Sequence, residues 1–70
     1  MALINEVEKE LSQITDHKCA LSVLPSGSIL ITLPVKSVFE SRWIMQSFNT
    51  PRFRAQRRDR SLQEVEVKYR

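Results

Sequence analysis

Residues 19–33 have the sequence CALSVLPSGSILITL, in which two apolar runs flank a Pro-Ser-Gly turn. In each run, residues 19–24 and residues 28–33, apolar side chains occupy every second position, and several of them are β-branched. This period and this composition are typical of strands. Gly27 can take the positive φ that a tight turn requires, and Pro34 ends the second strand because it has no N–H to donate. The segment therefore predicts a β-hairpin.

The residues before the hairpin predict an amphipathic helix over residues 2–16. Apolar residues recur there at spacings of four, four and three, which is the pattern of one helical face. They are Leu3, Val7, Leu11 and Ile14. Glutamates near the start, beginning with Glu6, suit the positive end of the helix dipole.

Residues 35–48 are open to two interpretations, of which a helix over residues 38–48 is favoured. Ser37 and Glu40 have the spacing of a capping box. As a strand, the segment would place Phe39, Trp43 and Met45 on one face, with serines between them along that face. On a helical wheel, one side carries Val35, Val38, Phe39, Trp43 and Met45, and the other carries Ile44 and Phe48. We expect the first side to be the main core face, so Ile44 and Phe48 predict a second contact surface.

Residues 49–61 predict a mobile basic arm. Five arginines spread around most of a helical wheel, so a helix here would gain little from packing. They are Arg52, Arg54, Arg57, Arg58 and Arg60. One helical turn anchored by Phe53 is an alternative.

The end of the chain predicts a third strand. Residues 64–70 alternate strictly, with Val65, Val67 and Tyr69 expected to point inward. A helix capped near residue 61 is an alternative, but it would separate the two valines on the wheel. We expect the strand to pair with an edge of the hairpin. Residues 1–70 are therefore expected to form a single small α+β domain with a three-stranded antiparallel sheet.

Charge is distributed unevenly along the 70 residues, whose formal net charge is +3. Residues 1–35 carry two bases and four acids, whereas residues 36–70 carry nine bases and four acids. All seven arginines lie in the second half, and arginine presents a planar fork of donors that suits carboxylate or phosphate. The pattern favours an anionic partner, although a charge this modest can also serve solubility alone.

The single cysteine and the single histidine exclude several sources of stability. Cys19 has no second cysteine for an internal disulfide, and His17 leaves a metal cage short of ligands. A domain this small often needs such a supplement, so we expect self-association, with a homodimer as its simplest form. No metal or cofactor is expected.

The N-terminus is acidic, and no apolar run reaches the roughly 20 residues of a membrane-spanning helix. An unpaired cysteine suits a reducing compartment. We therefore expect a cytoplasmic protein that does not contact a membrane.

Catalysis is not expected from this sequence. His17 and Cys19 are close enough in sequence for a Cys–His pair, but no orienting group or oxyanion hole is recognisable beside them. A buried structural cysteine next to an exposed histidine is the simpler interpretation. Gly27 is the only glycine, which excludes a glycine-rich phosphate loop.

The first functional hypothesis is a small, non-catalytic regulatory or accessory protein that binds DNA or RNA. An extended arginine-rich arm can follow a line of phosphates and become ordered on binding. The contact residues would be Arg52, Arg54, Arg57, Arg58 and Arg60, with Phe53 stacking on a base or packing under the arm, and with Lys36 and Arg42 extending the patch. The competing interpretation is a solvated connection whose arginines pair with Glu6, Glu8 and Glu10.

The second hypothesis is a protein-binding inhibitor or adaptor, which could itself be a homodimer. Trp43, Ile44 and Phe48 would form its exposed patch, with the arm beside it, because tryptophan and arginine are enriched at interface hot spots. A larger protein partner would then replace nucleic acid.

Overall fold

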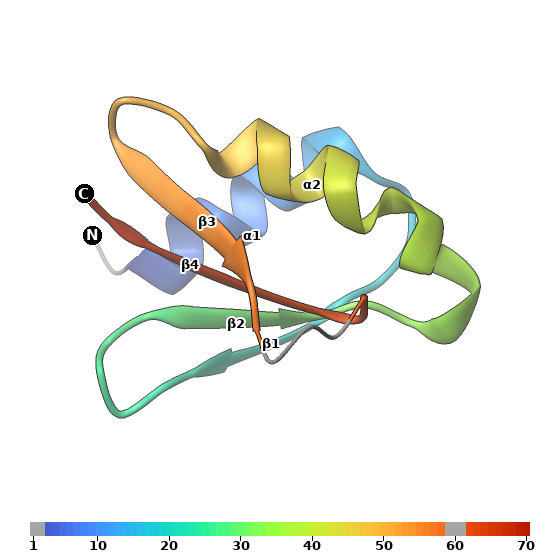
Figure 1. Ribbon diagram of the computed structural model, residues 1–70, viewed down its shortest axis with the longest axis horizontal. Coiled ribbons are helices and arrows are strands. Elements are labelled where there is room, and N and C mark those ends of the chain that lie inside the picture. The colour runs from blue at the N-terminus through green and yellow to red at the C-terminus, as the bar shows by residue number, and fades with distance from the viewer. Residues whose placement is uncertain (1–2, 59–61) are drawn as a thin grey trace.

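The computed structural model describes residues 3–58 and 62–70, and in these residues helices and strands form the expected α+β fold (Figure 1). Arg60 of the predicted arm lies outside the described residues. The elements are α1 (Leu3–Ile14), β1 (Ala20–Val23), β2 (Ile29–Thr32), the 3-10 helix η1 (Val35–Glu40), α2 (Ser41–Phe48), β3 (Phe53–Arg57) and β4 (Glu64–Tyr69).

The hairpin forms as predicted. β1 and β2 are antiparallel, with Leu21 opposite Ile31. Gly27 has a φ of 89°, and its N–H donates to the carbonyl of Leu24 at 2.8 Å. Glycine takes this left-handed conformation without the steric cost that a Cβ would add, so the turn depends on it.

The last strand also forms as predicted, except that Tyr69 is 44% exposed, and it lies inside the sheet. The strand order is β1-β2-β4-β3, and β4 pairs antiparallel with both neighbours. Val67 stands opposite Ile29 on one side and opposite Ala55 on the other. Val65 and Val67 are fully buried. β4 therefore joins the hairpin to the arginine-rich segment.

The prediction of a mobile arm and a three-stranded sheet is wrong for the described part of that segment. Residues 53–57 form β3, the fourth strand, because Phe53 and Ala55 alternate with arginine and glutamine and are both buried. A helical wheel does not reveal this alternation, because it arranges residues by the period of a helix and not by the two-residue period of a strand. Asn49 covers the free edge of β3: its Oδ1 accepts from the N–H of Ala55 at 3.0 Å, and its amide donates to the Ala55 carbonyl at 3.1 Å. Thr50 accepts from the N–H of Phe53 in the same way.

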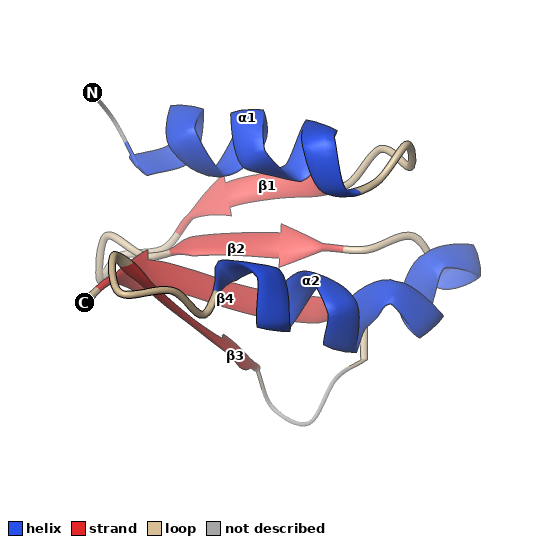
Figure 2. Cartoon of the chain, turned by 90° about the horizontal axis from the view of Figure 1, so that it is seen from above, coloured by secondary structure: helices blue, strands red, loops and turns tan. Residues whose placement is uncertain are grey.

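Both helices lie on the same side of the sheet (Figure 2). α1 packs over β1, β2 and β4, whereas α2 packs over β3 and β4. The core between these layers is apolar, and its fully or nearly fully buried residues include Val7, Ile29, Ile31, Leu33, Ile44, Phe48, Val65 and Val67. No helix or strand of the described chain packs on the opposite side of the sheet.

The predicted faces of the second helix are largely reversed, although Met45 packs partly buried against the core as expected. Ile44 and Phe48 are buried in the core, whereas Phe39 and Trp43 are 76% and 61% exposed. The residues that face the sheet are Ser37, Ser41, Ile44 and Phe48. Two of these four are serines, whose small side chains let the helix approach the sheet. Assigning the core face of this helix to its more hydrophobic side was therefore wrong for these residues.

The predicted capping box does not form. Ser37 is fully buried within η1, and its hydroxyl and that of Ser41 have no hydrogen-bond partner among the described residues. Glu40 turns instead toward α1, where its carboxylate accepts from the hydroxyl of Thr15 at 3.0 Å. This bond joins the end of η1 to the end of α1.

We expect Phe48→Ala to lower the free energy of unfolding by about 3–5 kcal/mol, since it removes a buried ring and leaves a cavity. That is comparable with the whole stability of a domain this small, so urea unfolding monitored by circular dichroism should show an unfolded or nearly unfolded chain. Ser41→Ala is the matched control on the same buried face. Removal of its unpartnered hydroxyl should leave stability unchanged or raise it. A folded Phe48→Ala variant of normal stability would contradict the packing described above.

Candidate functional site

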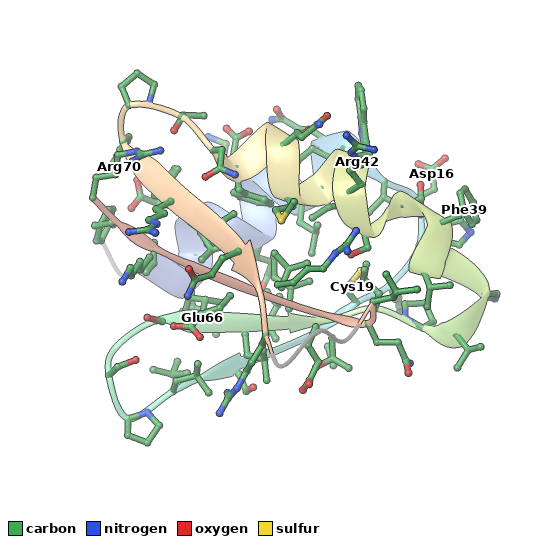
Figure 3. The ribbon with its side chains drawn as sticks, viewed as in Figure 1. Asp16, Cys19, Phe39, Arg42, Glu66 and Arg70 are labelled. Carbon is green, nitrogen blue, oxygen red and sulfur yellow. The ribbon has the colours of Figure 1, made fainter. Side chains whose placement is uncertain are left out.

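Four cations gather where β3 begins and β4 ends, and we call them the basic corner: Arg52, Arg54, Lys68 and Arg70. Arg54 stands directly opposite Lys68 in the sheet. The N–H of Arg70 donates to the carbonyl of Arg52 at 3.1 Å, which makes these two the next facing pair. All four side chains are exposed. Figure 3 places Arg70 at one end of the molecule, far from Phe39.

Three members of the basic corner, Arg54, Lys68 and Arg70, belong by alternation to the side of the sheet that no helix covers. Side chains alternate between the two sides of a strand, and Phe53, Ala55, Val65 and Val67 occupy the covered side. The residues between them therefore point to the open side. Like charges that face each other across two strands destabilise a sheet, so this arrangement costs stability when no anion is present.

Arg52 is held at the margin of the basic corner by α1. Its guanidinium group pairs with one carboxylate oxygen of Glu6, while the hydroxyl of Tyr69 donates to the other. The same guanidinium lies 5.4 Å from the ring centre of Phe53 and 5.9 Å from that of Tyr69. The hydrogen bond to the Glu6 carboxylate raises the pKa of Tyr69. Arg52 thus pairs with a glutamate of the first helix, as the competing interpretation of the arginines as a solvated connection expects.

The other predicted contact residues are not brought together. Arg57 is exposed at the end of β3, and its register position opposite Val65 assigns it to the helix-covered side. Arg58 is half-buried, and its N–H donates to the carbonyl of Glu64. Phe53 is 7% exposed and stacks on Tyr69, with ring centres 5.5 Å apart. It therefore packs under the strand, and the alternative in which it stacks on a base is not available to it.

Sequence reasoning missed Lys68 and Arg70 as members of this surface. Their signal was present in the strict alternation of residues 64–70, where every second residue is polar. The alternation assigned them to the outer side of a strand, but only the pairing of β4 with β3 shows which arginines stand beside them. The same outer side carries Glu64 and Glu66 farther along β4, so its positive charge is confined to one end.

A second surface lies on η1 and α2, and we call it the apolar stripe: Val35, Phe39 and Trp43. These residues are four apart, and they are 74%, 76% and 61% exposed. Of the predicted patch of Trp43, Ile44 and Phe48, only Trp43 is exposed. Arg42 is exposed beside the stripe.

His17 and Cys19 lie at one end of a cleft of about 610 Å³ between α1 and β1. The ring Nδ1 of His17 is 2.8 Å from a carboxylate oxygen of Glu40, and the thiol of Cys19 donates to the backbone carbonyl of His17 at 3.7 Å. The ring is therefore engaged by Glu40, and the sulfur is engaged by the backbone. Burial and then the Glu40 carboxylate raise the pKa of the Cys19 thiol, which is the opposite of what an activated nucleophile needs.

Within residues 3–58 and 62–70, no three histidine, cysteine or acidic side chains converge as metal ligands would. No helix in the same described ranges is long and apolar enough to cross a membrane.

The raised pKa of Cys19 predicts a pH-dependent stability. Folding favours the protonated thiol, so this contribution is full below the ordinary thiol pKa and is lost as pH rises through the raised folded value. Urea unfolding at neutral and alkaline pH should show a larger alkaline loss for the natural chain than for Cys19→Ala. Iodoacetamide should also alkylate the folded chain more slowly than the urea-unfolded chain at the same pH. Equal alkylation rates would contradict this environment for the thiol.

No protein-family model matches this chain, and neither the curated proteins nor the solved structures contain a match to it. The function must therefore be argued from the basic corner, the apolar stripe and the cleft.

Proposed function

We propose that this protein binds nucleic acid without catalysis, through the phosphates that its basic corner can contact. The observation that supports this is the pair of facing cations, Arg54 and Lys68. Arg70 follows on β4, where its Nε donates to the carbonyl of Thr50 at 2.6 Å. A pair of facing cations is unfavourable by itself, and a polyanion removes that cost by placing negative charge between the strands.

The spacing of these cations suits a chain of phosphates better than a single small anion. Residues two apart on a strand are separated by about 6.8 Å, which is of the order of the spacing between successive phosphates along a nucleic-acid strand. Lys68 and Arg70 have this separation on β4, and Arg54 repeats the charge on β3.

The contact we propose is with the backbone of the nucleic acid rather than with its bases. Sequence is read by groups that reach base edges or stack on bases, whereas phosphate contacts position the protein. The open side of β3 and β4 carries no aromatic residue in the described chain, and Phe53 is buried on the other side. We therefore expect little preference for base sequence, and binding to DNA and RNA alike.

A contact with another protein is the second candidate, and the exposed apolar stripe is the observation that favours it. The sequence-based hypothesis relied on Ile44 and Phe48, but both side chains are buried in the core. The stripe of Val35, Phe39 and Trp43 replaces them.

The nucleic-acid proposal predicts a specific salt dependence. If Arg54, Lys68 and Arg70 each neutralise one phosphate of duplex DNA, log affinity should fall against log salt with a slope of about −2.7. The double variant Arg54→Gln, Lys68→Gln should reduce this slope to about −0.9. Fluorescence anisotropy of a labelled duplex, titrated at several salt concentrations, measures both slopes.

Lys9→Gln, Lys18→Gln is the matched control because it removes the same two charges from α1 and the loop after it. Both double variants change the formal net charge from +3 to +1. The control should keep a slope of about −2.7. Equal losses in the two double variants, or no binding of duplex or single strands at low salt, would overturn the proposal.

A further inference from the structure

The apolar stripe is not used by the proposed contact with nucleic acid. Three large apolar side chains, Val35, Phe39 and Trp43, are mostly exposed on η1 and α2. Large apolar side chains exposed together on a small domain indicate an interaction site. We infer that the stripe packs against the same stripe of a second copy of this chain, forming a two-fold symmetric homodimer.

The area of the stripe suits the core of a small symmetric interface. A phenylalanine or tryptophan buries about 150–250 Å² when it is fully covered. The exposed parts of Phe39 and Trp43, together with Val35, therefore offer on the order of 300–400 Å² per copy. That is roughly half of the ~800 Å² that each partner buries in a standard interface. The residues around the stripe supply the rest, and the dimer should dissociate in the micromolar range.

The charges beside the stripe favour a second copy over a partner of a single charge. Glu40 accepts from Thr15 and its carboxylate lies 2.8 Å from the Nδ1 of His17, so the loop of residues 15–17, which carries Asp16, lies on the Glu40 side of the helix. Arg42 lies on the opposite side of the helix from Glu40, because residues two apart differ by about 200° around a helix.

A two-fold axis along the helix therefore brings Arg42 of each copy toward Asp16 of the other. The stripe thus has an acid on one side and a base on the other. This charge pattern is complementary to the same pattern on a second copy. A uniformly acidic or uniformly basic partner would meet a like charge on one side.

The inference does not rest on the proposed binding of nucleic acid. The stripe and the basic corner lie toward opposite ends of the molecule, as Phe39 and Arg70 show in Figure 3. A dimer formed through the stripe leaves both basic corners exposed. If both proposals hold, two corners joined in one particle would bind a long nucleic acid more tightly than one corner does.

Sedimentation equilibrium from micromolar to millimolar protein tests the inference, and the fluorescence of Trp43 locates the interface. Trp43 is the only tryptophan of the chain. We expect a monomer–dimer equilibrium in which Trp43 emission shifts to shorter wavelength and iodide quenching weakens as the dimer forms. Val35→Glu should weaken dimerisation about a hundredfold, because the symmetric interface buries the introduced carboxylate twice. Phe39→Ser is the second variant and should act in the same direction.

Val23→Glu is the matched control because Val23 is 60% exposed on the edge strand β1, away from the stripe. It should dimerise like the natural chain. A monomer at every concentration would overturn the inference, as would a dimer that Val23→Glu dissociates and Val35→Glu does not. A Trp43 shift that appears only when an oligonucleotide is added would overturn it as well, by assigning the stripe to base stacking.

Discussion

The pairing of β3 with β4 is the interaction on which the rest of this structure depends. Phe53 anchors it: the ring is buried, stacks on Tyr69 and meets Phe48 edge to face, with ring centres 6.4 Å apart. Asn49 occupies the free edge of the strand by bonding both backbone groups of Ala55. An edge strand covered in this way is protected from pairing with other chains. Residues 53–57 of the arginine-rich segment are therefore part of the sheet.

This pairing also explains how a chain of modest net charge builds one concentrated positive surface. Both helices cover the same side of the sheet, so the alternate residues of β3 and β4 remain exposed on the other side. The register then brings Arg54 to Lys68 and the two flanking arginines to each other. A fixed array loses less conformational entropy on binding than a disordered arm does, so the proposed contact with an anion gains from this arrangement.

The sequence predicted those elements whose apolar residues follow a single period. Val7 and Leu11 fall on the buried side of α1, and the alternations around Gly27 and Val67 became strands. The core face of the second helix was assigned to the wrong side because the buried face includes Ser37 and Ser41. Their burial follows from the short distance between helix and sheet rather than from hydrophobicity. β3 was missed because only two of its five residues are apolar, so its alternation was less evident than its arginines. The basic corner could not be predicted in full, since Lys68 and Arg70 join Arg54 only through a register that involves two distant segments.

Amide hydrogen exchange, resolved by residue with NMR, tests this account most directly. Because Ala55 bonds to Asn49 and Arg70 to Arg52, the alternation of an antiparallel ladder directs the amides of Arg54 and Gln56 toward β4. We predict that these two amides exchange at least about a hundredfold more slowly than in an unstructured peptide, since opening them requires unfolding of the domain. Exchange at the unstructured rate would show that the segment is an arm, and the fixed basic corner would then not exist.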